Sequence, residues 1–223
     1  MASATGCGAL VYSRAGHGGS EASRGPRPVR YLHEEALEVL PAVRDHFGLC
    51  DVVLFGHSDG ASIAILYAGA GPESRHPRGS VRAIILEAPH VFVEPLCLES
   101  MTRISAEYAT GRLRRRLSRH HGENTDSLFR SWIDVWLRPE FRTWNIEEAL
   151  PAIESPVLVI QGEDDEYGTV KQVEAVVTGV RGPARSLLLP RCGHSPHRER
   201  AEEVLDAAGR FVREILDRAG QPG

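Results

Sequence analysis

The sequence predicts an α/β fold in which helices flank a mostly parallel β-sheet. Short runs of β-branched and aliphatic residues alternate along the chain with segments of helical spacing, a pattern typical of such sheets. The predicted strands are residues 9–13, 51–55, 81–87, 156–161 and 184–190. The predicted helices are residues 33–47, 61–70, 170–180 and 200–218. Ligands of parallel sheets bind beyond the carboxyl ends of the strands, so a functional site is expected in the loops that follow them.

One segment interrupts this alternation. Residues 94–149 have helical spacing throughout, which predicts a helical cap insertion between two parts of the sheet domain, residues 1–93 and 150–223. Trp132 and Trp136 lie one helical turn apart in this segment. Such spacing is typical of a buried stripe, so these two residues and Trp144 are interpreted as the core of the cap rather than as a substrate platform.

Composition and charge indicate a single globular domain. The 223 residues are 42% hydrophobic and 25% charged, and the net charge of -4 favours neither nucleic acid nor an anionic membrane as a partner. The longest apolar runs are far shorter than the roughly 20 residues that span a bilayer. The four cysteines, Cys7, Cys50, Cys97 and Cys192, form no Cys-x-x-Cys pair, and the first residues lack a signal-peptide pattern. We therefore expect a cytoplasmic protein with reduced thiols.

The candidate nucleophile follows the second predicted strand. This strand ends in Gly56-His57-Ser58-Asp59-Gly60, and a helical pattern begins at once. Gly-x-Ser-x-Gly between a strand and a helix is typical of a nucleophile elbow, a sharp turn that raises the serine hydroxyl above the sheet. We expect Ser58 to have strained backbone angles and the two flanking glycines to relieve crowding. A serine that only caps the helix is the less favoured interpretation.

A serine hydroxyl needs a base, and the base needs an orienting carboxylate. Both residue types occur in clusters after later strands, in Gly162-Glu163-Asp164-Asp165-Glu166 and in Cys192-Gly193-His194-Ser195-Pro196-His197. The chain order of serine, acid and histidine is that of the nucleophile-elbow hydrolases. The histidines and carboxylates show no diagnostic metal-ligand spacing, so neither a metal nor another cofactor is expected.

These motifs resemble the α/β-hydrolase superfamily, in its branch of carboxylesterases and meta-cleavage-product hydrolases, and the resemblance covers nearly the whole chain. In this family the acid lies three residues after a glycine that closes its strand, which implies Asp165, and the base follows a glycine, which implies His194. Asp164 and His197 remain alternatives. The segment Arg14-Ala15-Gly16-His17-Gly18-Gly19-Ser20 is similar to the family's glycine-rich turn, which shapes a wall of the pocket.

The backbone amide of Asp59, directly after the nucleophile, is the candidate oxyanion donor. Its carboxylate is interpreted as a first-turn acid that stabilises the helix dipole by about 0.3 to 1 kcal/mol. An alternative role is discrimination against anionic substrates near the reacting carbonyl.

The resemblance also leads us to expect that the N-terminal strands of the family are missing. Family members carry further strands before the glycine-rich turn and a His-Gly loop with the second oxyanion donor, and this sequence contains no such loop. Residues 1–7 have the pattern of a helix tail. The expectation is an N-terminally truncated family member with impaired activity.

The predicted function is a serine hydrolase that cleaves carboxylic esters or related acyl bonds, such as thioesters, in a small-molecule substrate through an acyl-enzyme. Hydrolysis of a carbon-carbon bond by the same triad is the alternative reaction, and a catalytically impaired fold is the alternative to an enzyme. Dehalogenases and epoxide hydrolases of this fold carry Asp at the position of Ser58 and are disfavoured.

The basic segment of the predicted cap has two interpretations. Leu113 and Leu117 lie one turn apart in Arg112-Leu113-Arg114-Arg115-Arg116-Leu117, so the arginines are interpreted as the solvated face of an amphipathic helix. The alternative is a binding surface for an anionic acyl carrier protein or acyl-CoA.

Overall fold

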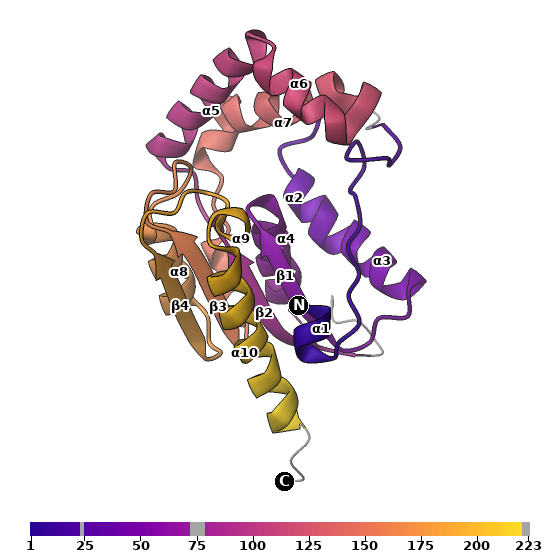
Figure 1. The fold of residues 1–223 in the computed structure, drawn as a ribbon, viewed down its shortest axis with the longest axis vertical. Coiled ribbons are helices and arrows are strands. Elements are labelled where there is room, and N and C mark those ends of the chain that lie inside the picture. Colours follow the sequence, from indigo (N-terminus) through magenta and orange to yellow (C-terminus); the bar gives the residue numbers. More distant parts are fainter. Residues whose placement is uncertain (23–24, 72–78, 220–223) are drawn as a thin grey trace. The chain divides into compact units, whose positions relative to one another are not determined.

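The computed structural model describes residues 1–22, 25–71 and 79–219 and divides into two compact units. The first unit consists of Met1–Gly8, Leu32–Phe92 and Asn145–Gly223, and the second of Ala9–Tyr31 and Val93–Trp144. The first unit contains the β-sheet, and the second is built mainly from helices (Figure 1). No helix within the described ranges is both long and apolar enough to cross a membrane.

The sheet of the first unit has four parallel strands in chain order, which confirms the predicted fold class. The strands are β1 (Val52–His57), β2 (Val81–Glu87), β3 (Val157–Gly162) and β4 (Ala184–Leu189). Each lies within two residues of its predicted position. The side chains of β3 and of the last five residues of β2 are all buried, as the apolar runs in the sequence predict.

The prediction of a strand at residues 9–13 is wrong. These residues have no regular secondary structure and belong to the second unit, and β1 pairs with β2 alone among the described strands. The apolar run is not buried, since Leu10 is 40% and Val11 93% exposed. Strand propensity mostly measures how a side chain packs on neighbouring strands, and this run has no such neighbour in the structure.

Helices cover both faces of the sheet. The helical segments of this unit are α1 (Ala2–Thr5), α2 (Tyr31–Glu34, whose first residue belongs to the second unit), the π-helical η1 (Glu35–Val39), α3 (Leu40–His46), α4 (Asp59–Gly69), η5 (Glu147–Ala152), α8 (Val170–Gly179), α9 (Pro196–Glu199) and α10 (Ala201–Ala219). Apolar residues of α10, such as Phe211 and Val212, share one core cluster with Ile85 of β2 and Ile160 of β3. The neighbouring β2 residue Ile84 points to the opposite face and is also fully buried, and α4 and α8 contact the strands.

The second unit contains the predicted cap helices. They are α5 (Pro95–Ala109), α6 (Arg112–His121), η3 (Gly122–Asn124), α7 (Thr125–Leu137) and η4 (Pro139–Thr143). Trp136, Phe141 and Trp144 form an aromatic cluster with ring centroids 4.9 to 6.2 Å apart. The indole N–H of Trp136 donates to the hydroxyl of Tyr31 at 3.0 Å. Trp136 and Trp144 are therefore core residues of the unit, as predicted, whereas Trp132 is half-buried and contacts Phe129 with ring centroids 6.0 Å apart.

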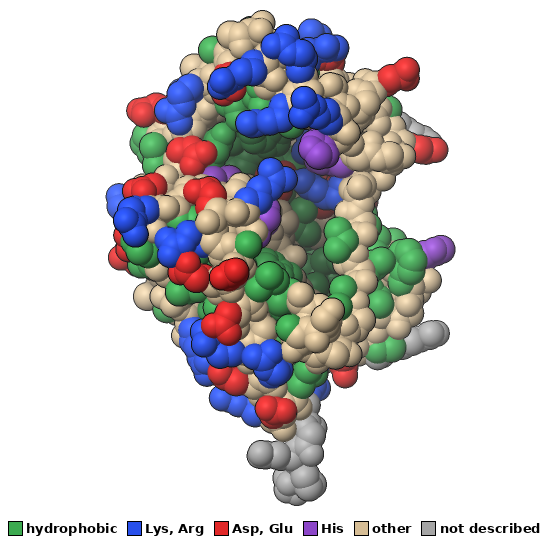
Figure 2. Space-filling model, viewed as in Figure 1, with side chains coloured by type: hydrophobic (Ala, Val, Ile, Leu, Met, Phe, Trp, Pro, Cys, Tyr) green, Lys and Arg blue, Asp and Glu red, His purple; other side chains and the backbone are tan. Residues whose placement is uncertain are grey.

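Helix α6 is amphipathic, with its arginines on the exposed face as predicted. Leu113 is buried, while Arg112, Arg114, Arg115 and Arg116 are exposed. Arginine side chains gather over α5 and α6 on the face in Figure 2. The guanidinium of Arg114 is held by both oxygens of the Asp126 carboxylate, and that of Arg112 lies 3.4 Å from the Glu107 carboxylate. Arg115 and Arg116 are also exposed to solvent. This arrangement supports the interpretation as a solvated helix face.

Candidate active site

The nucleophile elbow has the geometry that its sequence predicts. Ser58 lies between β1 and α4 with φ 54° and ψ -120°, a left-handed conformation that is strained for a residue with a Cβ. A Cβ on Gly56 would lie 2.2 Å from the carbonyl oxygen of Gly60, so only glycine fits there. A Cβ on Gly60 would meet no atom within 4 Å. The expectation that both glycines relieve crowding is therefore correct only for Gly56.

A third glycine brings the two later loops together. A Cβ on Gly162, the last residue of β3, would lie 2.2 Å from the carbonyl oxygen of Cys192. The amide of Asp164 donates to this same carbonyl at 2.9 Å, so the loop after β3 is hydrogen-bonded to the loop after β4. Because the carboxyl ends of parallel strands lie at one edge of the sheet, both loops also lie beside the elbow.

The structure brings Ser58, Asp165 and His194 into contact. Nδ1 of His194 lies 2.9 Å from Oδ1 and 3.0 Å from Oδ2 of Asp165, and Nε2 lies 3.0 Å from Oγ of Ser58. An ionised carboxylate only accepts hydrogen bonds, so Nδ1 of the neutral imidazole carries the proton. Nε2 is then left to accept from the Ser58 hydroxyl, which is the arrangement that a general base requires.

The two alternative residues lie elsewhere. Asp164 is exposed, and Nδ1 of His197 faces Glu87 rather than Asp165. Asp165, by contrast, is 6% exposed, and its carboxylate is hydrogen-bonded to three residues. It accepts from the amide of Tyr167 and from Nε2 of Gln161, each at 2.8 Å, in addition to His194. The geometry therefore favours Asp165 and His194 over their sequence neighbours.

The electrostatic surroundings keep Asp165 ionised. Burial alone would raise the pKa of its carboxyl. The hydrogen bond from His194, the positive charge of that residue when it is protonated and the bond from the Tyr167 amide outweigh burial and hold the pKa below its ordinary value. An ionised Asp165 keeps the proton of His194 on Nδ1 and stabilises the imidazolium that would form during catalysis.

Four polar residues near the site were not identified from the sequence. Glu87, His90 and Gln161 are buried, and His57 is half-buried. Three of them lie at the carboxyl end of a strand: His57 ends β1, Glu87 ends β2, and Gln161 is the next-to-last residue of β3. A polar residue at the carboxyl end of an apolar run is the signal that could have found these three.

Two of these residues are neutral imidazoles beside the base. Burial lowers the pKa of His57 and of His90 to about 4 in each case, and a protonated His194 acts in the same direction. Their ring centroids lie 5.1 and 5.7 Å from that of His194. Because both rings are uncharged at pH 7, neither repels a proton that moves onto His194.

Asp59 occupies the position expected of an oxyanion donor. It is the first residue of α4, so its amide lies at the positive end of the helix dipole, directly after Ser58. The Asp59 carboxylate lies in the first turn of the helix, as expected from the sequence. Its negative charge also acts to raise the pKa of His90.

The glycine-rich turn of residues 14–20 belongs to the second unit. Gly16 and Gly18 have φ of 80° and 54°, so both use the left-handed region that glycine allows. The amide of Gly18 donates to Nδ1 of His121 at 3.0 Å, which ties the turn to the end of α6. A role of this turn in a pocket wall remains a prediction.

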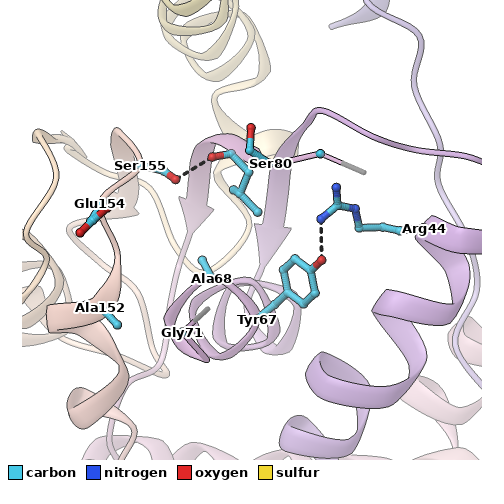
Figure 3. A pocket seen from close by; sticks show the side chains of 10 residues that line it. Arg44, Tyr67, Ala68, Gly71, Ser80, Ala152, Glu154 and Ser155 are labelled. Carbon is cyan, nitrogen blue, oxygen red and sulfur yellow. Dashed lines mark hydrogen bonds between the residues drawn. The ribbon is translucent and has the colours of Figure 1, made fainter. Parts of the chain in front are cut away.

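A cavity of about 230 Å³ lies at the opposite edge of the sheet (Figure 3). Ser80 and Val81, at the amino end of β2, line it together with Arg44 and Tyr67. The buried guanidinium of Arg44 donates to the Tyr67 hydroxyl and to carbonyls of the connection that leads into β1. Arg44 thus holds this connection in place, and none of the three residues Ser58, Asp165 and His194 lines the cavity.

In the described parts of the chain, no group of three or more His, Cys, Asp or Glu side chains could hold a metal ion.

Comparison with known proteins places this fold in a family. A family model described as "Alpha/beta hydrolase family" matches residues 1–207. The chain belongs to the α/β-hydrolase family. A search of curated protein sequences found no match.

Solved structures with the same fold include enzymes of different specificity. A thermophilic esterase from Thermogutta terrifontis is 20% identical with a TM-score of 0.59, and the match covers 90% of this chain and 78% of that one. An esterase from Exiguobacterium antarcticum is 18% identical with a TM-score of 0.62, covering 89% and 79%. A proline iminopeptidase from Mycobacterium smegmatis is 18% identical with a TM-score of 0.59, covering 86% and 75%. At these identities the likeness shows the fold of this α/β hydrolase and leaves its substrate open.

Proposed function

We propose that this α/β hydrolase is a serine hydrolase that cleaves carboxylic esters, or related acyl bonds such as thioesters, of a small-molecule substrate. The observation that carries the proposal is the position of the His194 imidazole, with Nε2 3.0 Å from Oγ of Ser58 and Nδ1 2.9 Å from Oδ1 of Asp165. A serine, a histidine and a carboxylate in this order and geometry form the apparatus that activates a hydroxyl for attack on an acyl carbon.

The proposed reaction has two steps. His194 takes the proton of Ser58 through Nε2 as Oγ attacks the carbonyl carbon, and it then gives that proton to the leaving alcohol or thiol. The resulting acyl-enzyme is hydrolysed by a water molecule, which His194 activates in the same way. Asp165 keeps His194 in the tautomer that accepts through Nε2, and the amide of Asp59 donates to the developing oxyanion.

Two features of the elbow support this assignment of roles. The strained backbone of Ser58 is expected where a hydroxyl must stand clear of the sheet, and a residue that only caps a helix needs no such strain. In addition, no cap hydrogen bond is formed by the side chain of Ser58 to the amides of α4. Oγ of Ser58 is hydrogen-bonded to His194 instead.

A fluorophosphonate probe tests the proposal, because it reports an activated serine without knowledge of the substrate. We expect the parent chain to be labelled and to hydrolyse p-nitrophenyl esters, and Ser58→Ala to lose both activities while keeping its melting temperature. Ser62→Ala is the matched control, since Oγ of Ser62 donates to the His90 carbonyl at 2.6 Å and has no role in attack. Equal labelling of the parent and Ser58→Ala would contradict the proposal, as would a parent chain that folds and is not labelled.

A further inference from the structure

The loop that carries His194 is held by a buried carboxylate of a neighbouring strand. Glu87 is the last residue of β2, and its side chain is 1% exposed. Its Oε1 accepts a hydrogen bond from the backbone amide of His197, and its Oε2 lies 3.0 Å from Nδ1 of the same residue. The backbone carbonyl of Glu87 accepts from the amide of Ser58 at 2.9 Å. A single residue thus binds both the nucleophile elbow and the loop of the base.

A second contact comes from the residue that precedes the nucleophile. Nε2 of His57 lies 2.7 Å from the backbone carbonyl oxygen of His194, so Nε2 carries the ring proton and donates it to this bond. His57 is also the strand partner of Glu87 in the register of β1 and β2. The two contacts therefore start from adjacent positions in the sheet and hold the loop at His194 and His197.

Packing alone does not account for the carboxylate. The four preceding residues of β2, Ala83 to Leu86, are apolar and fully buried. A carboxylate at the next position loses its hydration, and burial raises the pKa of Glu87, although the charge and hydrogen bonds of His197 act against this rise. An apolar side chain would fill the same space without this desolvation penalty. What the carboxylate adds is the pair of hydrogen bonds to His197.

We propose that Glu87 and His57 are positioning residues, which hold the loop of residues 194–197 so that Nε2 of His194 stays within hydrogen-bond distance of Ser58. The inference rests on the proposed serine hydrolase function. Neither residue is placed to touch a reacting atom, since both act on the loop that bears the base. A displacement of a catalytic group by about 1 Å can lower turnover about a hundredfold, so a loop held at only one point would be costly.

The first test compares kcat with KM for p-nitrophenyl acetate. Glu87→Gln keeps one acceptor oxygen but replaces the other with a donor, and His197→Gln removes Nδ1 while keeping the backbone amide. We expect each substitution to lower kcat by about tenfold to a hundredfold, with KM changed less than twofold. The double variant should be no slower than the slower single variant, because the two side chains form one interaction. Additive losses would overturn the role of the pair.

A rescue series tests His57 separately. His57→Gln places an amide donor within reach of the His194 carbonyl, whereas His57→Leu has a similar volume and no donor. We expect His57→Gln to retain several times the kcat of His57→Leu. The control for both series is Asp51→Asn, since Asp51 holds the amide and hydroxyl of Ser80 at 2.9 Å at the far end of the same strands. This control should lower the melting temperature and leave kcat unchanged.

A spectroscopic measurement keeps the test independent of turnover. The proton shared by Nδ1 of His194 and the carboxylate of Asp165 should give a far-downfield proton resonance. We expect this resonance to broaden or vanish in Glu87→Gln and His57→Leu and to persist in Asp51→Asn. A resonance and a kcat that stay unchanged in Glu87→Gln and His57→Leu would overturn the positioning role.

The two proposals fail in different ways. A parent chain that shows the resonance and is not labelled by the fluorophosphonate would remove the proposed function, while the response of the resonance to the variants would still decide the positioning role. Should Glu87→Gln fail to fold, the two His57 variants decide it by the same readouts.

Discussion

The buried His90 should make this hydrolase sensitive to mild acid. His90 is 2% exposed, and burial lowers its pKa from 6.5 to about 4. Besides burial, the groups that change the pKa of His90 are His194, Asp165, the Tyr167 carbonyl and Asp59. Above pH 6.5 the histidine is neutral in the folded and unfolded states and has no effect on stability. As the pH falls from 6.5 to about 4, the unfolded state takes up a proton that the folded state refuses, so the free energy of unfolding decreases.

The magnitude follows from the two pKa values. The difference between 6.5 and about 4, at about 1.36 kcal/mol per pH unit, corresponds to about 3 kcal/mol for His90. In His90→Gln, an amide can still donate to the Tyr167 carbonyl, which lies 3.2 Å from Nε2 of His90, and nothing titrates at this position. The free energy of unfolding of the parent, relative to that of His90→Gln, should therefore be about 3 kcal/mol lower at pH 4 than at pH 7.

Urea unfolding of both proteins between pH 4 and pH 8 measures this change. Protonation of carboxylates affects parent and variant alike, so it cancels in their difference. His46→Gln is the control, because the side chain of His46 is exposed in the folded protein. Parallel stability curves for the parent and His90→Gln over the whole range would refute the argument that burial keeps this imidazole neutral.

Two further pairs of substitutions test the site. Asp165→Asn should lower ester turnover by about 10³ to 10⁴, because an amide no longer holds the base in its working tautomer, while Asp164→Asn should leave turnover within about twofold. Equal losses would move the orienting role to Asp164. In the elbow, Gly56→Ala should lower the free energy of unfolding by more than about 2 kcal/mol, since its Cβ would lie 2.2 Å from a backbone oxygen. Gly60→Ala, in the first turn of α4, should instead raise it by about 0.5 to 1 kcal/mol, and similar values from chemical denaturation would contradict the steric account.

The strands that sequence analysis located best are those with an uninterrupted apolar run. The predicted residues 81–87 match β2 at both ends, because both faces of this strand are covered and the sequence need not alternate. The run at residues 9–13 has the same kind of composition and forms no strand. Pairing with a neighbouring strand decides between these outcomes, and a local sequence contains no information about its partner.

The candidate site residues that could be predicted are those that lie in short sequence motifs. The strand, turn and helix around Ser58 predict it as the nucleophile, and the family resemblance implies Asp165 and His194 from their positions after glycines. The contacts of Glu87 and His57 with the loop of the base could not be read in this way, because they join residues 110 and 137 positions apart in the sequence. Only the parallel register of the sheet places such residues together.

Two glycines allow backbone segments to approach closely, so that short side chains are enough to form the site. Gly56 lets the backbone of the elbow turn back on itself, and Gly162 lets the loop after β4 cross the end of β3, in each case with a backbone oxygen 2.2 Å from where a Cβ would lie. Once the backbones are this close, the side chains that follow are already within hydrogen-bond reach. Asp165 and His194 then need no long, flexible side chains to meet, so little side-chain entropy is lost in forming their contact. A methyl group at Gly162 would separate the two loops, and it would therefore disturb the base and its orienting acid together although Gly162 contacts no substrate atom.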